Sequence, residues 1–363
     1  MYPETVSLCI VALNEENILP KLLEDVYSQT YPHQKTQVVL VDSGSSDATK
    51  KIMENFAKEN KDEYISVTVA DNPKRIQASG WNVAIINSVC DVIIRVDAHT
   101  SIPCDFIELN MKNLQSGEYV SGGVRPCIIE NKTLWGKALL EAENSLFGSS
   151  IGKARSGTKK EYVKTMFHGA YRRSVFADTG GFNEKLLRTE DNELHFRIRK
   201  AGYKLCFDPQ ILSYQYARSS FRKMIKQKYG NGYWIGLTLG VCPGCISAYH
   251  LIPFAFLIGI IATGFLAARG IWQPGALMWG AYLAFALIST AASIAKKGFN
   301  PFFLLIPFFF LTLHISYGVG TLTGICSIPF KSRHLNSCEM IETVKSVMKE
   351  FDENENNIYK SPV

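Results

Sequence analysis

Residues 92–100 read VIIRVDAHT, a run of β-forming residues that ends in an aspartate, a small residue and a histidine. An apolar run of this length, closed by polar residues, predicts a buried strand of a parallel sheet. Asp97 and His99 would then lie at the carboxyl end of that strand, where open α/β sheets bind ligands. A strand that merely ends in a polar turn is the alternative interpretation of the same residues.

The pair formed by Asp97 and His99 suggests a metal site. Only Ala98 separates the two residues, so both side chains can point into one crevice. A carboxylate oxygen and an imidazole nitrogen are suitable ligands for a divalent cation. The chain has no glycine-rich phosphate loop of the GxGxxG or GxxxxGK[ST] type, so phosphates bound there are expected to need a metal.

Strand-like and helix-like segments alternate on the amino-terminal side of this stretch. The expected strands lie at residues 6–12, 38–41 and 66–70, and the expected helices at 18–29, 50–60 and 76–87. Strands that alternate with helices predict an α/β fold with a mainly parallel sheet and right-handed crossovers.

A second aspartate, Asp42, also lies just beyond an expected strand, in the turn-rich segment DSGSSDAT at residues 42–49. A carboxylate at this position can accept hydrogen bonds from a base N–H or a ribose hydroxyl. It should not contact phosphate directly unless a cation or a basic group lies between them.

Two further carboxylates, Glu190 and Asp191, follow Thr189 at the expected start of a helix. Acidic residues in a first helical turn are favourable because of the helix dipole, which explains them without any chemistry. The functional interpretation is that one of them takes a proton from an incoming hydroxyl group.

Three long apolar runs occupy the carboxyl-terminal third, at residues 250–268, 275–295 and 301–330. Each approaches or exceeds the roughly 20 residues that a helix needs to cross a bilayer. The sequence therefore divides into a domain over residues 1–230, a membrane-proximal linker over 231–247, a transmembrane region of about three helices over 248–330 and a charged polar tail over 331–363.

The flanking charges bear on the membrane. The net charge of the chain is +6. A basic cluster before the apolar runs predicts either attraction to anionic lipid headgroups or a solvated helix face. The cluster consists of Arg218, Arg222, Lys223, Lys226 and Lys228. Met1 leads almost directly into the first expected strand without a secretory signal, and the nine cysteines are scattered, so we expect the first domain to lie in the cytoplasm.

The side of the tail is left open by the sequence. Three crossings would place Lys296 and Lys297 inside, as the positive-inside rule prefers, but would place the tail outside. A broken or re-entrant segment near residues 235–247 or 318–324 would return the tail to the inside. His314, within the third run, would face a lipid-linked substrate or pair with a neighbouring helix.

The motifs taken together resemble the pattern of glycosyltransferase family 2. In order they are VALNEE at 11–16, VDSGSSDAT at 41–49, VDAH at 96–99, TED at 189–191 and GYK at 202–204. The resemblance covers residues 5 to 215, and the order and spacing make it specific. The Asp-Ala-His form, with HISYGVG at 314–320, resembles the bacterial exopolysaccharide branch of succinoglycan-biosynthesis type.

The resemblance implies a GT-A fold, a nucleotide-diphosphate sugar donor and a cofactor that is Mg²⁺ or Mn²⁺. By position, Asp97 would contact the ribose and diphosphate and hold the metal with His99, while Asp191 would be the catalytic base with Glu190 beside it at the acceptor. The remaining donor-binding residues implied in this way are Leu13, Asn14, Glu15, Asp42, Arg75 and Asn82.

Two departures from the family pattern matter. The usual DxD is DxH here, so His99 stands in place of the second carboxylate. The QxxRW of processive synthases is missing, because Gln227 is followed by KYGN. The second departure suggests transfer of one sugar per encounter, and three apolar runs are few for a polysaccharide channel.

The expected function is that of an inverting, metal-dependent glycosyltransferase of the hexosyltransferase type. It would be a multi-pass protein of the bacterial cytoplasmic membrane that acts on a lipid-linked, polyprenyl-type acceptor in exopolysaccharide or cell-surface glycan synthesis, with no nucleic-acid partner. A polyprenyl-phosphate sugar synthase is one alternative. An inactive transferase-like membrane scaffold is another, and the intact set of Asp42, Asp97 and Asp191 argues against it.

Overall fold

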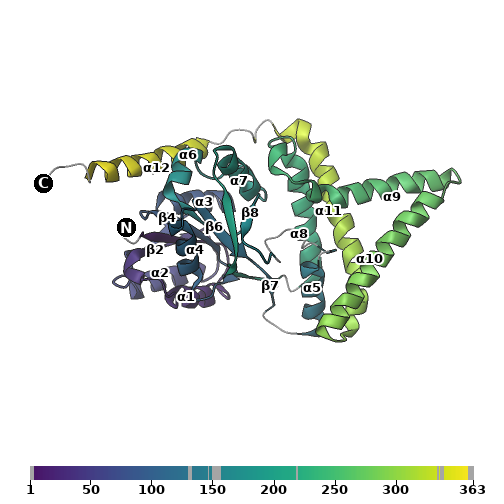
Figure 1. Ribbon diagram of the computed structural model, residues 1–363, viewed down its shortest axis with the longest axis horizontal. Coiled ribbons are helices and arrows are strands. Elements are labelled where there is room, and N and C mark those ends of the chain that lie inside the picture. Colours follow the sequence, from purple (N-terminus) through teal and green to yellow (C-terminus); the bar gives the residue numbers. More distant parts are fainter. Residues whose placement is uncertain are drawn as a thin grey trace. The chain divides into compact units, whose positions relative to one another are not determined.

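A computed structural model describes residues 4–129, 133–145, 147–148, 157–217, 220–332, 335 and 339–358 of the chain. These residues form two compact units (Figure 1). The first unit contains residues 1–125, 157–215 and 337–363, and the second contains 126–156 and 216–336. The units differ from the predicted boundaries, because residues 126–156 and 216–230 join the apolar helices and the tail joins the first unit. Residues 148–160 are rich in Gly, Ser and Lys, which predicts a loop, and they lie largely outside the described residues.

An eight-stranded, mainly parallel sheet forms the centre of the first unit, as the alternating pattern predicted. β1 pairs in parallel with β2 and β4, and β2 pairs in parallel with β3. β9 runs antiparallel to β4 and β6, while β10 is parallel to β6. Across the sheet the strands are β3 (Ser66–Asp71), β2 (Thr36–Asp42), β1 (Val6–Ala12), β4 (Val92–Asp97), β9 (Gly169–Arg172), β6 (Val120–Val124), β10 (Leu205–Leu212) and β8 (Glu161–Val163).

Helices cover both faces of this sheet, because alternate strand residues point to opposite sides. Leu8 and Ile10 of β1 belong to one apolar cluster, whereas Cys9 between them belongs to the other. The helices of the unit are α1 (Leu19–Tyr27), α2 (Thr49–Glu59), α3 (Gln77–Ile86), α4 (Phe106–Gln115), α6 (Arg173–Thr179), α7 (Glu190–Lys200) and α12 (Glu339–Ile358). A separate small sheet has the order β5 (Thr100–Ser101), β11 (Tyr214–Tyr216), β7 (Cys127–Ile128).

The carboxyl-terminal helix α12 packs on α6 and α3 as part of the first unit. Val344 and Met348, one turn apart, are fully buried in the apolar cluster of Cys9. Gly181 N–H donates to the carbonyl of Ile341. Within the expected polar tail, α12 is thus an amphipathic helix. It was not predicted because charged residues alternate with its apolar ones.

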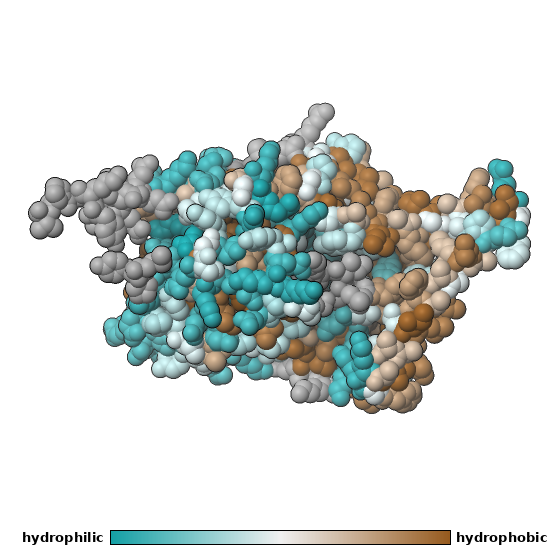
Figure 2. All heavy atoms as spheres, viewed as in Figure 1, coloured by the Kyte–Doolittle hydropathy of each residue, from teal (hydrophilic) through white to brown (hydrophobic). Residues whose placement is uncertain are grey.

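The second unit holds the three long apolar helices that the sequence predicted. The helices of the unit are α5 (Leu134–Asn144), α8 (Phe221–Thr238), α9 (Ile252–Ala268), α10 (Gln273–Lys297) and α11 (Ile306–Lys331). The segments long and apolar enough to cross a membrane are Ala248–Ala268, Gln273–Lys297 and Pro301–Lys331. Figure 2 shows apolar residues gathered over α9 and α10.

Close helix contact joins α8 to α11. A Cβ added at Gly232 of α8 would lie 2.1 Å from the carbonyl oxygen of Tyr317, and one at Gly324 of α11 would lie 2.1 Å from that of Tyr233. Small residues of this kind let two helix backbones approach closely. Much of the expected linker over 231–247 is therefore helix α8, packed along its neighbour.

His314 of α11 pairs with a neighbouring helix, which was one of its two expected roles. Its Nδ1 lies 2.9 Å from the hydroxyl oxygen of Tyr282 on α10. Lys228 of α8 and Glu143 of α5, both buried, form an ion pair of 3.1 Å in the same unit. Each of these polar side chains thus has a polar partner within the unit.

The burial of α12 leads to a test. We expect Val344→Asp to lower the free energy of unfolding of the first unit by on the order of 3 kcal/mol, because it buries a charge and loses apolar contact. Thermal melting of the purified protein measures the effect. Ser346→Asp, on the exposed face of the same helix, is the control, and equal melting of both variants would contradict the docking.

Candidate active site

The loops that follow β1 and β2 are joined by side-chain hydrogen bonds. Asn14, in the left-handed conformation at φ 57°, accepts a hydrogen bond of 2.8 Å from the backbone N–H of Ser46. The backbone N–H of Glu15 donates to the hydroxyl of Thr49 at 2.8 Å. Leu13 between strand and loop is 40% exposed. The first predicted donor residues thus lie at the carboxyl edge of the sheet, beside the loop that carries Asp42.

Asp42 is almost fully buried at the end of β2. Its carboxylate accepts from the backbone N–H groups of Gly44 at 3.1 Å and Ser45 at 3.2 Å. The side chain of Arg75 lies over Gly44, since a Cβ added there would meet Arg75 Nε at 3.3 Å. The structure therefore places the side chain of Arg75 beside Gly44, in the loop that follows Asp42, and this puts a positive charge beside the predicted nucleoside pocket.

Asn82 occupies a different environment from the other predicted donor residues. Its side chain is fully buried, and Nδ2 donates to the carbonyl of Phe182 at 2.9 Å and to Glu184 at 3.0 Å. Its Oδ1 accepts from the backbone N–H of Phe182 at 2.7 Å. Asn82 therefore holds the loop before α7, and the contacts seen for its amide are all within the protein.

Asp97 is held by basic and neutral groups from three other elements. Arg125 donates to Oδ2 at 3.0 Å, His168 Nε2 lies 3.2 Å from the same oxygen, and Gln77 donates to Oδ1 at 3.2 Å. Burial opposes ionisation, but the hydrogen bond with His168 and the charges of Arg95 and Arg125 outweigh it and hold the pKa of Asp97 well below its ordinary value.

His168 itself is buried, and burial lowers its pKa to about 4. The imidazole is therefore neutral at pH 7, with Nδ1 2.9 Å from the Ser213 hydroxyl. His168, Arg125 and Gln77 were not predicted as site residues, because they come from separate segments and belong to no motif. The available signal in the sequence was that these are polar residues in segments expected to lie near the end of β4.

His99 lies beyond the end of β4 and makes contacts that Asp97 does not share. Its Nδ1 is 3.4 Å from a carboxylate oxygen of Glu15, and its Nε2 is 3.3 Å from the amide nitrogen of Gln215. No group of three or more His, Cys, Asp or Glu residues within the described part of the chain is arranged to hold a metal ion.

Asp191, in the first turn of α7, forms a two-pronged ion pair with Arg95 of β4. Arg95 Nη1 donates to Asp191 Oδ1, and Arg95 Nη2 donates to Asp191 Oδ2 at 2.9 Å. The arginine side chain is 4% exposed and the aspartate 22% exposed. Because Arg95 precedes Asp97 by two residues, this pair ties the first turn of α7 to the strand that carries the predicted metal ligand.

Glu190 lies next to Asp191 but in a drier environment. It is 4% exposed, and its Oε2 has no hydrogen-bond partner among the described residues. Burial, and next the charge of Asp191, raise the pKa of Glu190 to about 8. Adjacent carboxyl groups with such different environments are suited to different roles, one as a proton acceptor and the other as a neutral hydrogen-bond donor.

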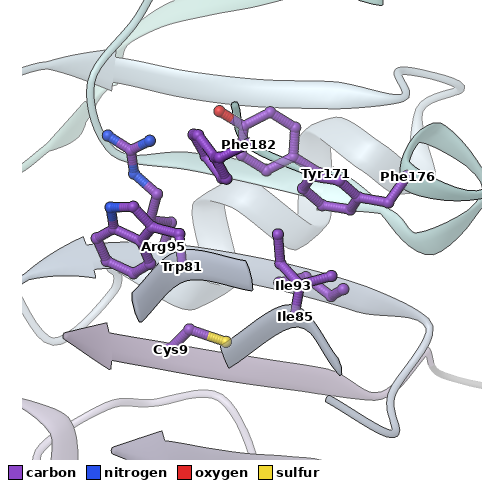
Figure 3. A pocket seen from close by; sticks show the side chains of 8 residues that line it. All are labelled: Cys9, Trp81, Ile85, Ile93, Arg95, Tyr171, Phe176 and Phe182. Atoms are coloured by element: carbon purple, nitrogen blue, oxygen red, sulfur yellow. The ribbon is translucent and has the colours of Figure 1, made fainter. Parts of the chain in front are cut away.

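The guanidinium group of Arg95 is enclosed by aromatic rings (Figure 3). It lies 4.8 Å from the ring centre of Trp81 and 5.2 Å from that of Phe182. The void between these side chains and the strands is about 10 Å³, which holds one water molecule at most. The space behind Arg95 therefore belongs to the core and is not a substrate pocket. The guanidinium group of Arg95 is held between this core and Asp191.

Comparison with known proteins gives a family for the larger part of the first unit. Residues 7–180 match the model described as Glycosyl transferase family 2. The chain is 28% identical over 294 residues to the succinoglycan biosynthesis protein ExoA of Rhizobium meliloti (strain 1021), covering 77% of this chain and 86% of that protein.

A second relative comes from Methanococcus voltae and is named dolichyl N-acetyl-alpha-D-glucosaminyl phosphate 3-beta-D-2,3-diacetamido-2,3-dideoxy-beta-D-glucuronosyltransferase. It is 28% identical over 325 residues, covering 86% of this chain and 95% of the relative. Among solved structures, a mannosyltransferase from Pyrobaculum calidifontis in complex with GDP-Man and Mn²⁺ superposes with a TM-score of 0.56 at 18% identity, covering 89% of this chain and 88% of that one. This likeness establishes the GT-A fold.

Proposed function

Because residues 7–180 form a glycosyltransferase family 2 domain, we propose that this enzyme transfers one sugar from a nucleotide-diphosphate donor to a lipid-linked acceptor, with inversion at the anomeric carbon. The chain is a glycosyltransferase of polysaccharide or glycan synthesis. The observation that carries the finer proposal is the Arg95–Asp191 pair, which links the acid of the TED motif to the strand that ends at Asp97.

Donor binding is assigned to the carboxyl edge of the sheet. Leu13, Asn14 and Glu15 border the nucleoside there, and Asp42 accepts hydrogen bonds from the base. Arg75, which lies over Gly44, is placed to balance the charge of the diphosphate. The Pyrobaculum calidifontis neighbour holds GDP-Man in its structure, and the nucleotide of this enzyme is left open.

Asp97 and His99 have the donor atoms that a divalent cation needs. Among the described residues, Asp97 Oδ1 accepts a hydrogen bond from the neutral amide of Gln77 alone, and His99 is 27% exposed beside Glu15. With two such protein ligands, Mg²⁺ or Mn²⁺ would take its remaining ligands from water and substrate phosphates, as is usual for Mg²⁺ at phosphate sites. When bound, the metal supplies positive charge against the departing diphosphate.

The acceptor side is assigned to α7. Asp191 accepts the proton of the acceptor hydroxyl, whose oxygen then attacks the anomeric carbon from the face opposite the leaving group. Arg95 acts through Asp191 by holding both carboxylate oxygens, and its contacts with the rings of Trp81 and Phe182 fix its direction. Glu190 lies beside it, and because burial and then the charge of Asp191 raise its pKa to about 8, we assign it to donate a hydrogen bond to the bound acceptor.

The metal assignment leads to a direct test. We expect Asp97→Asn to remove the part of nucleoside-diphosphate affinity that depends on Mn²⁺, because the cation loses its charged ligand. Calorimetric titration of a panel of nucleoside diphosphates with and without Mn²⁺ measures this. Asp178→Asn, at an exposed position on α6, is the control. Equal Mn²⁺ dependence in Asp97→Asn and the wild type would rule out Asp97 as a ligand.

The base assignment is tested by turnover and by the product. We expect Asp191→Asn to lower kcat by roughly 10²- to 10⁴-fold with donor binding unchanged, because the general base is lost. We expect Arg95→Lys to lower kcat by about 100-fold with donor KM unchanged, because lysine cannot hold both oxygens. NMR of the wild-type product should show the anomeric configuration opposite to that of the donor.

Arg173→Lys is the matched control, since Arg173 is a buried arginine that donates to the carbonyl of Cys90. In the Asp191→Asn background, Arg95→Lys should cause no further loss, because the two residues act as one unit. Wild-type turnover of Asp191→Asn, or a retained configuration, would overturn the base assignment. A full additional loss in the double variant would overturn only the positioning role of Arg95.

The enzyme is associated with a membrane through its apolar helices, and we assign it to the bacterial cytoplasmic membrane with the first unit in the cytoplasm. A lipid-linked acceptor suits this placement, because its sugar end lies at the membrane surface. The polyprenyl-phosphate synthase alternative differs only in using a bare lipid phosphate, and analysis of the labelled lipid product separates the two.

A further inference from the structure

Two contacts within the units restrict how the chain crosses the membrane. The first is the docking of α12, whose Val344 and Met348 are fully buried in the core of the first unit. The chain leaves this unit after residue 215 and returns to it at residue 337. Since one folded unit lies on one side of a bilayer, the segment between these residues crosses an even number of times.

The second contact is the direction in which α8 and α11 pack. Phe221 stacks near Phe309 with ring centres 4.6 Å apart, and Gly232 meets the backbone of Tyr317. Further along, Gly236 meets the backbone of Thr321. Residue numbers rise together along both helices, so the two helices are parallel.

These two facts exclude a crossing by α11. If α11 crossed, its carboxyl end at Lys331 would lie on the side of the first unit, because α12 follows within eight residues. Its amino end would lie on the far side. The parallel α8 would then begin on the far side too. However, α8 begins at Phe221, six residues after the first unit ends.

The helices α9 and α10 have the properties of a crossing pair. Phe256 stacks on Tyr282 at 4.5 Å, and Gly259 lies against Met278. Residue numbers run in opposite directions, so the two helices form an antiparallel hairpin with its tip at residues 269–272. Large apolar side chains are exposed along it, among them Ile261, Phe265, Leu283 and Ile288. Segments of 21 and 25 residues are long enough to cross.

Charge and burial favour a surface position for α8 and α11. Arg222, Lys223 and Lys226 are exposed on α8, and taking them across a bilayer would be costly. On the cytoplasmic surface they are attracted to anionic headgroups. In α11, 33% of the most apolar stretch is buried within the unit, against 6% in α9 and 17% in α10.

We propose that the α9–α10 hairpin is the membrane-crossing element, and that α8 and α11 lie together in the headgroup region of the leaflet that faces the first unit. The base of the hairpin, with Lys296 and Lys297, is then on the same side as the first unit, in agreement with the positive-inside rule. This arrangement does not depend on the proposed catalytic roles.

Cysteine labelling of the full-length protein tests the arrangement. Single cysteines replace exposed residues: Ile271 at the hairpin tip, Phe299 between α10 and α11, and Ser346 on α12. The exposed Cys104 and Cys326 are first changed to serine. We expect a membrane-impermeant maleimide to label Ile271→Cys in intact spheroplasts, and to label Phe299→Cys and Ser346→Cys only after lysis.

Each other pattern overturns the proposal. Labelling of Ser346→Cys from outside would mean that the tail is not docked on a cytoplasmic unit. Labelling of Phe299→Cys from outside with Ser346 inside would mean that α11 crosses. Protection of Ile271→Cys in intact spheroplasts would mean that the hairpin does not cross.

Spin labels give an independent measure of depth. Positions Phe308, Cys326 and Phe330 are exposed along α11 and span about 33 Å of helix. Labels there should report similar depths from the relative accessibility of oxygen and a nickel complex, because the helix lies along the surface. A depth that reaches a maximum mid-helix and returns at the far leaflet would contradict the proposal.

Discussion

The ion pair between Arg95 and Asp191 is the contact on which the arrangement of the active site depends. It joins the first turn of α7 to the central strand β4, with a guanidinium group enclosed by Trp81 and Phe182. Phe182 is in turn fixed by Asn82, which bonds to both its backbone N–H and its carbonyl. A buried charge that lacked its partner would be strongly destabilising, so this network favours a single arrangement of β4, which ends at Asp97, and the α7 helix.

In the proposed arrangement, the connections between helices, more than their hydropathy, determine which apolar segments cross the membrane. All three apolar segments are long enough to cross, and length alone assigns three spans. In the proposed arrangement, the burial of α12 in the first unit and the parallel packing of α8 with α11 reduce the number of spans to two. The proposal places the tail on the side of the first unit, a question that charge counting left open.

The local features of the fold were predictable from the sequence, whereas the contacts between distant segments were not. The VIIRVD run forms β4 with all six residues buried, because a continuous apolar stretch between helices suits only a central strand. The expectation that Asp97 and His99 share a crevice rested on strand alternation. The strand ends at Asp97, and the two side chains have separate contacts. The partners Arg125 and His168 come from 28 and 71 residues further along the chain.

The place of α12 also has a consequence for biosynthesis. Val344 and Met348 complete a core whose other fully buried members all come before residue 206. A ribosome has therefore made the whole hairpin before it makes the residues that close this core. The apolar surface beside α3 and α6 therefore stays open until α12 has been made, after the α9–α10 hairpin that we propose to cross the membrane. Completion of this domain therefore follows synthesis of the hairpin, and a chain that ends before residue 339 would keep an open apolar surface of the kind that quality-control proteases recognise.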